Sequence, residues 1–269
     1  MAEVASRDKP VVGTGRTALV VDDGPGRVLK RFRDGFTADD EWMRTSAVAA
    51  AGLVAMARPI GRVDEGIVFE CIEGASMLDA LSRRPWELFR HARALATLEA
   101  QVHNVRAHGV RATGLPSTRD QLSSAIRAAG LDEVTTLRAL SALDALPDGD
   151  RLAHGDLHPG NVLLSERGPV LIDWADATRG EPLADAARTW LLLTVSAIPE
   201  GAPLRWLVVR ARARFAAAWR TAYTAAHPHD AVMLERWFTV VAAARLAEAI
   251  EAERRDLLDI VDKGLAAAT

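Results

Sequence analysis

The hydrophobic pattern of the chain changes near residue 75, and this change constrains the fold more than any other feature of the sequence. Before it come short runs rich in Val and Leu, VVGTGRTALVV and GRVLKRF, which are separated by the turn-forming stretch DDGPG. Two more strands are predicted around a turn within GRVDEGIVFECIEG. Residues 37–51 predict a helix, with Thr37 or Asp39 as its N-cap and Gly52 at its end. The sequence thus predicts a β-rich region of about five strands with one helix.

The pattern after residue 75 is mainly helical. Apolar residues fall on one helical face in LFRHARALATLEAQVHNV, namely Leu88, Ala92, Leu95, Leu98 and Val102. More helices are expected across residues 118–146 and from Gly180 to the end, and one hairpin is expected in NVLLSERGPVLIDW. We therefore predict an α+β fold with a small antiparallel β-rich lobe over residues 1–74 and a larger, mainly helical lobe over residues 75–269.

Charge and composition narrow the class of protein. The chain has 33 Lys and Arg against 36 Asp and Glu, and this balance argues against a nucleic-acid partner. The longest apolar run, Trp190 to Ile198, is too short to span a bilayer, and the N-terminal sequence lacks the apolar stretch of a signal peptide. We expect a cytoplasmic protein without a membrane partner, and the oligomeric state is left open.

Several side chains are predicted to lie in the core. Cys71, within IVFECI, is expected to be a buried structural thiol rather than a nucleophile. Tryptophans of the helical part are expected in the core rather than on a binding surface: Trp190, Trp206, Trp219 and Trp237.

Residues 154–174, HGDLHPGNVLLSERGPVLIDW, carry the most informative motif. The order His-x-Asp-Leu-x-x-x-Asn, followed by Asp173 after a short hairpin, is similar to the catalytic loop and metal-binding Asp of kinase-like phosphotransferases. In that chemistry a carboxylate orients the attacking hydroxyl and accepts its proton, and Asp156 is the candidate. Hard oxygen ligands hold Mg²⁺ on the triphosphate, and Asn161 and Asp173 are the candidates. The hairpin is expected to bring these two residues together.

The combination of HGDLHPGN and IDW resembles the aminoglycoside phosphotransferase and choline kinase-like family, small-molecule kinases with the protein kinase-like two-lobed fold. The resemblance implies transfer of the γ-phosphate of ATP, with GTP not excluded, to a hydroxyl of a small molecule in the presence of Mg²⁺. Gly155 replaces the Arg of the protein kinase His-Arg-Asp, which implies that no phosphorylated activation loop is read. Asp185 resembles the buried helix Asp that braces the catalytic loop, and His154 resembles the loop-bracing His.

The upstream residues follow the same order. Gly13 and Gly15 lie between two strand signals, where a glycine loop would let backbone N–H groups approach phosphates. Ala18 stands where a third glycine would be, and a plain hairpin turn is the alternative. Lys30 in VLKRF corresponds to the strand lysine that contacts the α- and β-phosphates. Only three residues of the chain are lysines, and Lys30 is the one placed to reach phosphates.

Two further nucleotide contacts follow from the resemblance. Glu41 resembles the helix glutamate that holds the strand lysine, although Asp39 or Asp40 could take that role. The backbone C=O of Glu70 and N–H of Ile72 would meet the edge of the adenine, and a core strand ending in a turn is equally compatible with this run.

The remaining histidines receive structural interpretations, and no metal is assigned to histidine. His158 is expected near the transferred phosphate or as a stabiliser of the loop, and His103 is expected to be structural. His227 and His229 in AAHPHD are expected to be solvated.

The acceptor is the least readable feature, because the last 80 or so residues resemble the family only in helical character. Acidic residues near the C-terminus could bind a cationic acceptor, but an exposed and self-paired helix face is favoured: Glu248, Glu251, Glu253, Asp256 and Asp259. Asp176 could also face an acceptor. The acceptor could be an aminoglycoside-like or other antibiotic, or a metabolite such as choline or a sugar. A nucleotide-binding regulator with a decayed site is an alternative, against which the intact Asp156, Asn161 and Asp173 argue.

Overall fold

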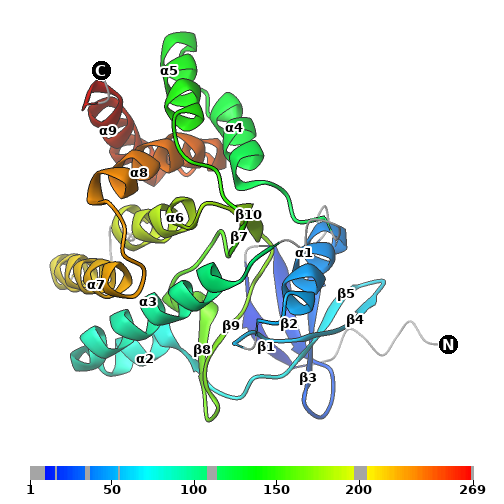
Figure 1. The fold of residues 1–269 in the computed structure, drawn as a ribbon. Coiled ribbons are helices and arrows are strands. Elements are labelled where there is room, and N and C mark those ends of the chain that lie inside the picture. The colour runs from blue at the N-terminus through cyan, green and yellow to red at the C-terminus, as the bar shows by residue number, and fades with distance from the viewer. Residues whose placement is uncertain are drawn as a thin grey trace.

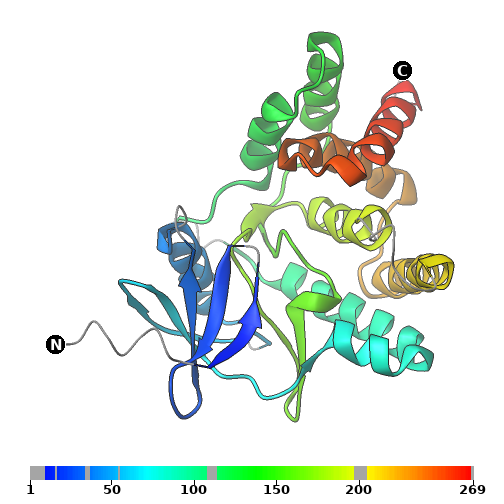
Figure 2. The same ribbon diagram turned by 180° about the vertical axis from the view of Figure 1, so that it is seen from behind.

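The N-terminal region forms the antiparallel sheet that its pattern predicts (Figure 1). The computed structural model describes residues 10–15, 17–33, 37–53, 55–107, 114–196 and 205–267. In it five strands pair in the order β1-β2-β3-β5-β4, with bounds β1 Val11–Thr14, β2 Ala18–Asp22, β3 Arg27–Phe32, β4 Pro59–Val63 and β5 Gly66–Glu70. A small apolar cluster inside this sheet joins Val21, Leu29 and Val68. Figure 2 shows β1, β2 and β3 from the other side.

One helix, α1 (Asp39–Ala50), lies between β3 and β4 in the chain and begins after Ala38. Both predicted N-caps are wrong, because the residue at the cap, Ala38, has no side-chain acceptor and the helix starts at Asp39 itself. The first turn is instead acidic, with Glu41 its buried member, and negative charge there is favourable at a helix N-terminus. The buried Ala47 and Val48 of α1 join the core of the helical part, so the helix packs against both parts of the molecule.

Two small sheets connect the N-terminal region to the helices. β6 (Ala75–Ser76) pairs with β8 (Val162–Ser165), and β8 pairs with β9 (Gly168–Leu171), which is the predicted hairpin. A separate two-stranded sheet joins β7 (Arg151–Ala153) to β10 (Thr178–Gly180). The backbone also connects β9 to the segment before β4, since Leu171 accepts from the N–H of Ala57 at 3.0 Å and donates to the C=O of Ala55 at 2.8 Å. This contact fixes the end of β9 beside the N-terminal sheet.

Helices make up most of the remainder, as predicted. Their bounds are α2 Met77–Arg83, α3 Leu88–Asn104, α4 Thr118–Ala128, α5 Glu133–Asp144, α6 Pro182–Val195, α7 Arg205–Ala226, α8 Ala231–Arg245 and α9 Glu251–Ala267, with short 3-10 helices η1 Pro85–Glu87, η3 Pro159–Asn161 and η4 Leu246–Glu248. The predicted apolar face of α3 is buried along its whole length, against α7 among others. Helix α6 packs on α8. The α3–α7 pair and the α6–α8 pair together enclose the main core.

Three core predictions are corrected by the structure. Trp219 and Trp237 are buried, but Trp206 is 64% exposed because it lies in the first turn of α7, and Trp190 is only half-buried. Cys71 is exposed, since it follows the last residue of β5 and only its N–H is held, by the C=O of Gly26. The thiol therefore has no structural role in the core.

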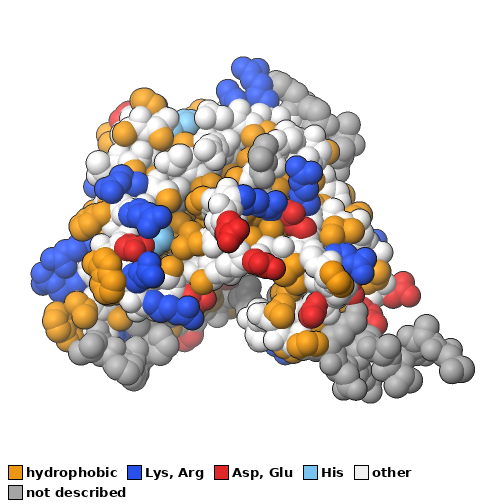
Figure 3. All heavy atoms as spheres, turned by 90° about the horizontal axis from the view of Figure 1, so that it is seen from below, with side chains coloured by type: hydrophobic (Ala, Val, Ile, Leu, Met, Phe, Trp, Pro, Cys, Tyr) orange, Lys and Arg blue, Asp and Glu red, His pale blue; other side chains and the backbone are white. Residues whose placement is uncertain are grey.

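Figure 3 shows basic and acidic side chains both present across the face seen from below. In the described ranges, no helix has the length and apolarity needed to cross a membrane.

Candidate active site

Asp185, in the first turn of α6, fixes the start of the predicted catalytic loop. Its Oδ2 accepts from the N–H of His154 at 2.8 Å and its Oδ1 accepts from the N–H of Gly155 at 2.7 Å. Nε2 of His103 lies 3.0 Å from Oδ2, which is the structural position expected for this histidine. Burial alone would raise the pKa of Asp185, but the hydrogen bond and charge of His103, with the His154 N–H, hold it below its usual value. An ionised carboxylate therefore braces the loop.

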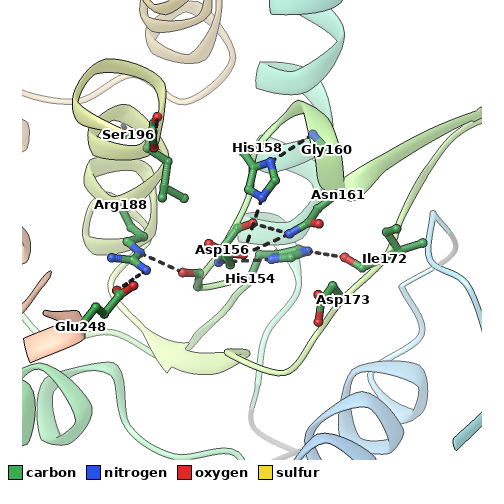
Figure 4. Close-up of polar contacts among 12 residues, drawn as sticks. His154, Asp156, His158, Gly160, Asn161, Ile172, Asp173, Arg188, Ser196 and Glu248 are labelled. Carbon is green, nitrogen blue, oxygen red and sulfur yellow. Dashed lines mark hydrogen bonds and ion pairs between the residues drawn. The ribbon is translucent and has the colours of Figure 1, made fainter. Parts of the chain in front are cut away.

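Asp156 and Asn161 lie together at the end of this loop (Figure 4). The Asn161 side-chain amide donates to the backbone C=O of Asp156 at 2.8 Å and to its Oδ2 at 3.2 Å. His158 places Nε2 3.7 Å from the same Oδ2, while its Nδ1 accepts from the N–H of Gly160. Burial would raise the pKa of Asp156, but the hydrogen bond and charge of His158, followed by the charge of Arg188, bring it below its ordinary value. The half-buried carboxylate is thus ionised, the form in which a carboxyl group accepts a proton.

Asp173 follows β9 in a left-handed backbone conformation, with φ 64°, which is uncommon for a residue other than glycine. The residue before it is held at both of its backbone polar groups: Ile172 donates its N–H to the C=O of Asn161 at 3.0 Å, and its C=O lies 3.1 Å from Nε2 of His154. Strained backbone of this kind is concentrated at functional sites. The Asp173 side chain meets Lys30 of the N-terminal sheet.

Lys30 of β3 pairs with Glu41 of α1, as the resemblance implies. Nζ lies 2.7 and 2.8 Å from the two carboxylate oxygens of Glu41 and 3.0 Å from Oδ1 of Asp173. Burial would lower the pKa of Lys30, but the charges of Asp173 and Glu41 outweigh it and raise that pKa. Both alternatives to Glu41 are exposed, and Asp39 instead pairs with Arg62.

The other predicted nucleotide contacts lie along the sheet. Gly13 is in β1 beside an irregularity in the pairing of β1 with β2. Gly15 lies in the β1–β2 connection, where its N–H donates to the C=O of Ala18 at 2.9 Å. Glu70 ends β5, where its carboxylate binds Arg167 at 2.7 Å, and the half-buried Ile72 follows two residues later. The structure brings Lys30, Glu41, Asp156, Asn161 and Asp173 into one site.

The donor set of this site suits Mg²⁺. Asn161 directs its amide nitrogen to Asp156, which leaves the amide oxygen available, and Asp173 supplies a carboxylate that is 42% exposed. Carboxylate and amide oxygens are the ligands that hard divalent cations prefer. Asn161 and Asp173 therefore fit the role of Mg²⁺ ligands.

The sequence analysis missed Arg188, three residues after Asp185 on α6. Its Nε donates to the C=O of Gly155 at 3.2 Å, and its charge acts on Asp156 and Asp176. Nothing in a local motif marks this residue, because its partner in the loop is a backbone carbonyl.

Gly155 has a structural reason for being glycine that the sequence analysis did not give. Its φ is 81°, and a Cβ there would overlap the backbone C=O of Asp176. The desolvating surroundings of Asp176 and the charge of Asp156 raise the pKa of the Asp176 carboxyl. The loop and the segment after β9 are therefore in close contact.

Two predictions about the C-terminal region are wrong. Glu253 is only 2% exposed, because it pairs with the buried Arg245, so the acidic residues do not form one solvated face. His227 and His229 are half-buried rather than solvated, since both rings pack near Tyr223, with centroid distances of 5.6 Å.

Comparisons with known proteins agree with this geometry. A model of the phosphotransferase enzyme family matches residues 13–231. A search of the curated proteins found no match. Among solved structures, a thermostable mutant of aminoglycoside phosphotransferase APH(4)-Ia is similar at 15% identity and a TM-score of 0.66, with 97% of this chain and 95% of that chain covered.

A choline kinase and a choline/ethanolamine kinase family protein are also similar. The first is choline kinase LicA from Streptococcus pneumoniae, at 17% identity and a TM-score of 0.57, covering 95% of this chain and 91% of that chain. The second is a choline/ethanolamine kinase family protein from Mesorhizobium loti, at 16% identity and a TM-score of 0.56, covering 99% and 89%. These likenesses show the fold. Together with the family match they confirm the predicted family, the two-lobed α+β fold and the enzyme class: the chain belongs to the phosphotransferase enzyme family.

Proposed function

We propose that this enzyme transfers the γ-phosphoryl group of ATP to a hydroxyl of a small molecule, with Asp156 as the group that orients the hydroxyl and accepts its proton. The observation that carries the proposal is the convergence of residues from three regions on one site. Lys30 comes from β3, Glu41 from α1, and Asp173 follows β9. The Lys30 ammonium group binds the carboxylates of both Glu41 and Asp173.

Each residue has a role that its surroundings support. Lys30 binds the α- and β-phosphates, because its charge is held in place by Glu41 and a second carboxylate. Asn161 and Asp173 would hold Mg²⁺, which when bound neutralises charge on the phosphates. Asp156 accepts the proton of the acceptor hydroxyl, and the Asn161 amide keeps its carboxylate in position. The peptide groups near Gly13 and Gly15, and those of Glu70 and Ile72, would contact the nucleotide.

A small molecule is the acceptor class that the site favours. The loop from Asp173 leads to the start of α6 within nine residues, so an activation segment of protein kinase length is absent from this described stretch. Similar structures were solved with GDP and kanamycin and with streptomycin and ATP, which supports nucleotide use and makes ATP and GTP the two donors to test. We place the enzyme in the cytoplasm, with residues 1–74 as the nucleotide lobe and residues 75–269 as the catalytic and acceptor lobe.

The test is phosphoryl transfer with purified protein, Mg²⁺ and either ATP or GTP against amino sugars, cyclic peptide antibiotics, choline and sugars. The proposal expects ADP or GDP release that depends on one acceptor class and a phosphorylated product of matching mass. If neither turnover nor a Mg²⁺-nucleotide-dependent thermal shift occurs, the proposal fails. A Mg²⁺-nucleotide-dependent thermal shift with no turnover, either on the acceptor panel or in the absence of an acceptor, would favour the nucleotide-binding regulator with a decayed site.

A further inference from the structure

The peptide between Gly155 and Asp156 is held at every polar atom. Its C=O accepts from Nε of Arg188 at 3.2 Å, and its N–H, that of Asp156, points to Nδ1 of His154 at 3.3 Å. The preceding N–H, that of Gly155, donates to Asp185, which lies three residues before Arg188 and on the same face of α6. Two residues on one face of α6 therefore bind Gly155: Asp185 binds its N–H and Arg188 binds its C=O.

Arg188 is itself held by a chain of charged side chains, shown in part in Figure 4. Its Nη2 lies 2.6 Å from Oε1 of Glu248, and Oε2 of Glu248 lies 2.7 Å from Nη1 of Arg245. Arg245 in turn binds both carboxylate oxygens of Glu253, at 2.9 and 3.2 Å. These ion pairs connect the catalytic loop through α6 and η4 to the last residue of α8 and the first turn of α9.

Burying these charged side chains costs desolvation free energy, which argues that the ion pairs do more than stabilise the fold. The side chains of Arg245 and Glu253 are 7% and 3% exposed, and buried ion pairs often contribute no more stability than apolar residues of the same size. Ala249, directly after Glu248, has φ 53°, a left-handed conformation that is unfavourable for a residue with a side chain. The backbone is therefore strained next to the residue that bridges the two arginines.

Arginine is required at the centre of this chain. Nε binds the Gly155 carbonyl while Nη2 binds Glu248, so two separate N–H groups of one rigid guanidinium act in two directions. A lysine presents a single ammonium on a flexible stem and does not reproduce this geometry.

We propose that Arg188 is a positioning residue for phosphoryl transfer: it fixes the Gly155–Asp156 peptide, and Glu248, held by Arg245 and Glu253, keeps Arg188 in place. The proposal rests on the proposed function for its kinetic consequences. Arg188 acts through the backbone that carries Asp156 rather than on the nucleotide. Its loss therefore misplaces the carboxylate without weakening the nucleotide site.

The experiment compares Arg188→Met, Arg188→Lys and Glu248→Gln with a matched control, Arg119→Met. Arg119 is similarly exposed and also binds backbone carbonyls, those of Leu143 and Leu146, but none in the catalytic loop. The probe is Mg²⁺-ATP turnover, measured as ADP release with water as acceptor and with any acceptor found. We expect Arg188→Met and Arg188→Lys to lower kcat by about tenfold to a hundredfold, with KM for Mg²⁺-ATP and Kd for Mg²⁺-ADP unchanged within about twofold.

Two further readouts separate positioning from general destabilisation. Glu248→Gln should lower kcat less than Arg188→Met, and the double variant should equal Arg188→Met alone, because Glu248 acts only through Arg188. Guanidinium ion added to Arg188→Ala should restore part of kcat and should have no such effect on Arg119→Ala. A kcat equal to wild type in Arg188→Met, a rise in KM that matches the fall in kcat/KM, or additive losses in the double variant would overturn the proposal.

Amide hydrogen exchange decides the proposal even without turnover. If the wild-type protein shows no ATP turnover, the proposed function fails, and exchange of the peptide covering residues 154–157 is then compared among the variants. Faster exchange there in Arg188→Met, with wild-type exchange in Arg119→Met, would support the grip on the loop. Unchanged exchange in Arg188→Met would overturn it.

Discussion

Lys30 and Asp173 lie 143 residues apart in the chain, yet the lysine Nζ is 3.0 Å from the aspartate Oδ1. The contact joins the N-terminal sheet to the end of the β8–β9 hairpin. It depends on backbone bonds between Leu171 and residues 55–57, which hold the hairpin end beside the sheet. The proposed nucleotide site is therefore made by two parts of the fold that meet at this point.

Replacement of Lys30 tests the nucleotide side of the site. Lys30→Ala removes the ammonium proposed to bind the α- and β-phosphates, so KM for Mg²⁺-ATP should rise about tenfold to a hundredfold, the equivalent of one charged hydrogen bond. Steady-state kinetics over ATP concentration measure this. The matched control is Lys263→Ala, an exposed lysine on α9, which should leave KM at the wild-type value. Equal KM values for wild type and Lys30→Ala would place the phosphates elsewhere.

Metal dependence tests Asn161 and Asp173. Chelation of divalent cations should abolish turnover, and Asp173→Asn should raise the Mg²⁺ concentration needed for half-maximal activity by about tenfold or more, since a carboxylate ligand is lost. Titration of activity against free Mg²⁺ is the measurement, with Asp144→Asn, an exposed aspartate on α5, as control. A wild-type Mg²⁺ titration for Asp173→Asn would show that this residue is not a ligand.

The backbone at Gly155 makes a stability prediction. Gly155→Ala adds a Cβ at φ 81° that meets the Asp176 backbone, so it should destabilise the fold by about 2 kcal/mol or more. Gly130→Ala is the control, because Gly130 has φ 66° with open space where the Cβ would go, and it should cost only about 1–2 kcal/mol. Urea unfolding of both variants measures the difference. Equal losses would mean that the loop does not press against Asp176.

Glu99 makes a prediction about pH. It is fully buried, accepts from Nε1 of Trp219 at 2.8 Å, and has a pKa raised well above its ordinary value by burial and by the charge of Asp185. The folded state thus keeps a proton that the unfolded state loses above about pH 4.3. The free energy of unfolding contributed by this group is therefore largest at low pH and falls as pH rises toward the folded-state pKa.

Glu99→Gln removes this titration while keeping an oxygen acceptor for Trp219. Its Tm relative to wild type should rise between pH 5 and pH 8, by about 2–4 °C for each kcal/mol of relief. Glu235→Gln, an exposed residue on α8, should show a Tm difference that does not change with pH. A pH-independent difference for Glu99→Gln would mean that Glu99 is ionised in the folded protein.

The sequence predicted those parts of the site that lie on short, ordered motifs. Asp156, Asn161 and Asp173 share one loop and hairpin, so their spacing alone predicts their proximity, and Lys30 follows from its place on a strand before them. What the sequence could not supply was the group of contacts made through backbone atoms. Arg188 binds the carbonyl of Gly155, and such a bond leaves no pattern in residue types.

The sequence also could not predict whether residues at the ends of helices and strands are buried. Cys71 and Trp206 lie in apolar runs, but one follows the end of β5 and the other begins α7, and a shift of one or two residues in an element's end decides exposure there. Glu253 was misjudged for the opposite reason, because its buried partner Arg245 belongs to a different helix. Local periodicity does not show which charges meet across helices.

The most direct test of the account is phosphoryl transfer by Asp156→Asn beside the wild-type protein, with γ-labelled ATP, Mg²⁺ and the acceptor panel. Asn161 would still have an oxygen to bind at position 156, so the loop should keep its shape while the proton acceptor is lost. The account predicts that wild type labels an acceptor, that Asp156→Asn lowers kcat by at least about a hundredfold, and that both proteins bind Mg²⁺-ADP with Kd values within about threefold. Labelling by Asp156→Asn at the wild-type rate, or loss of Mg²⁺-ADP affinity in proportion to the loss of labelling, would contradict it.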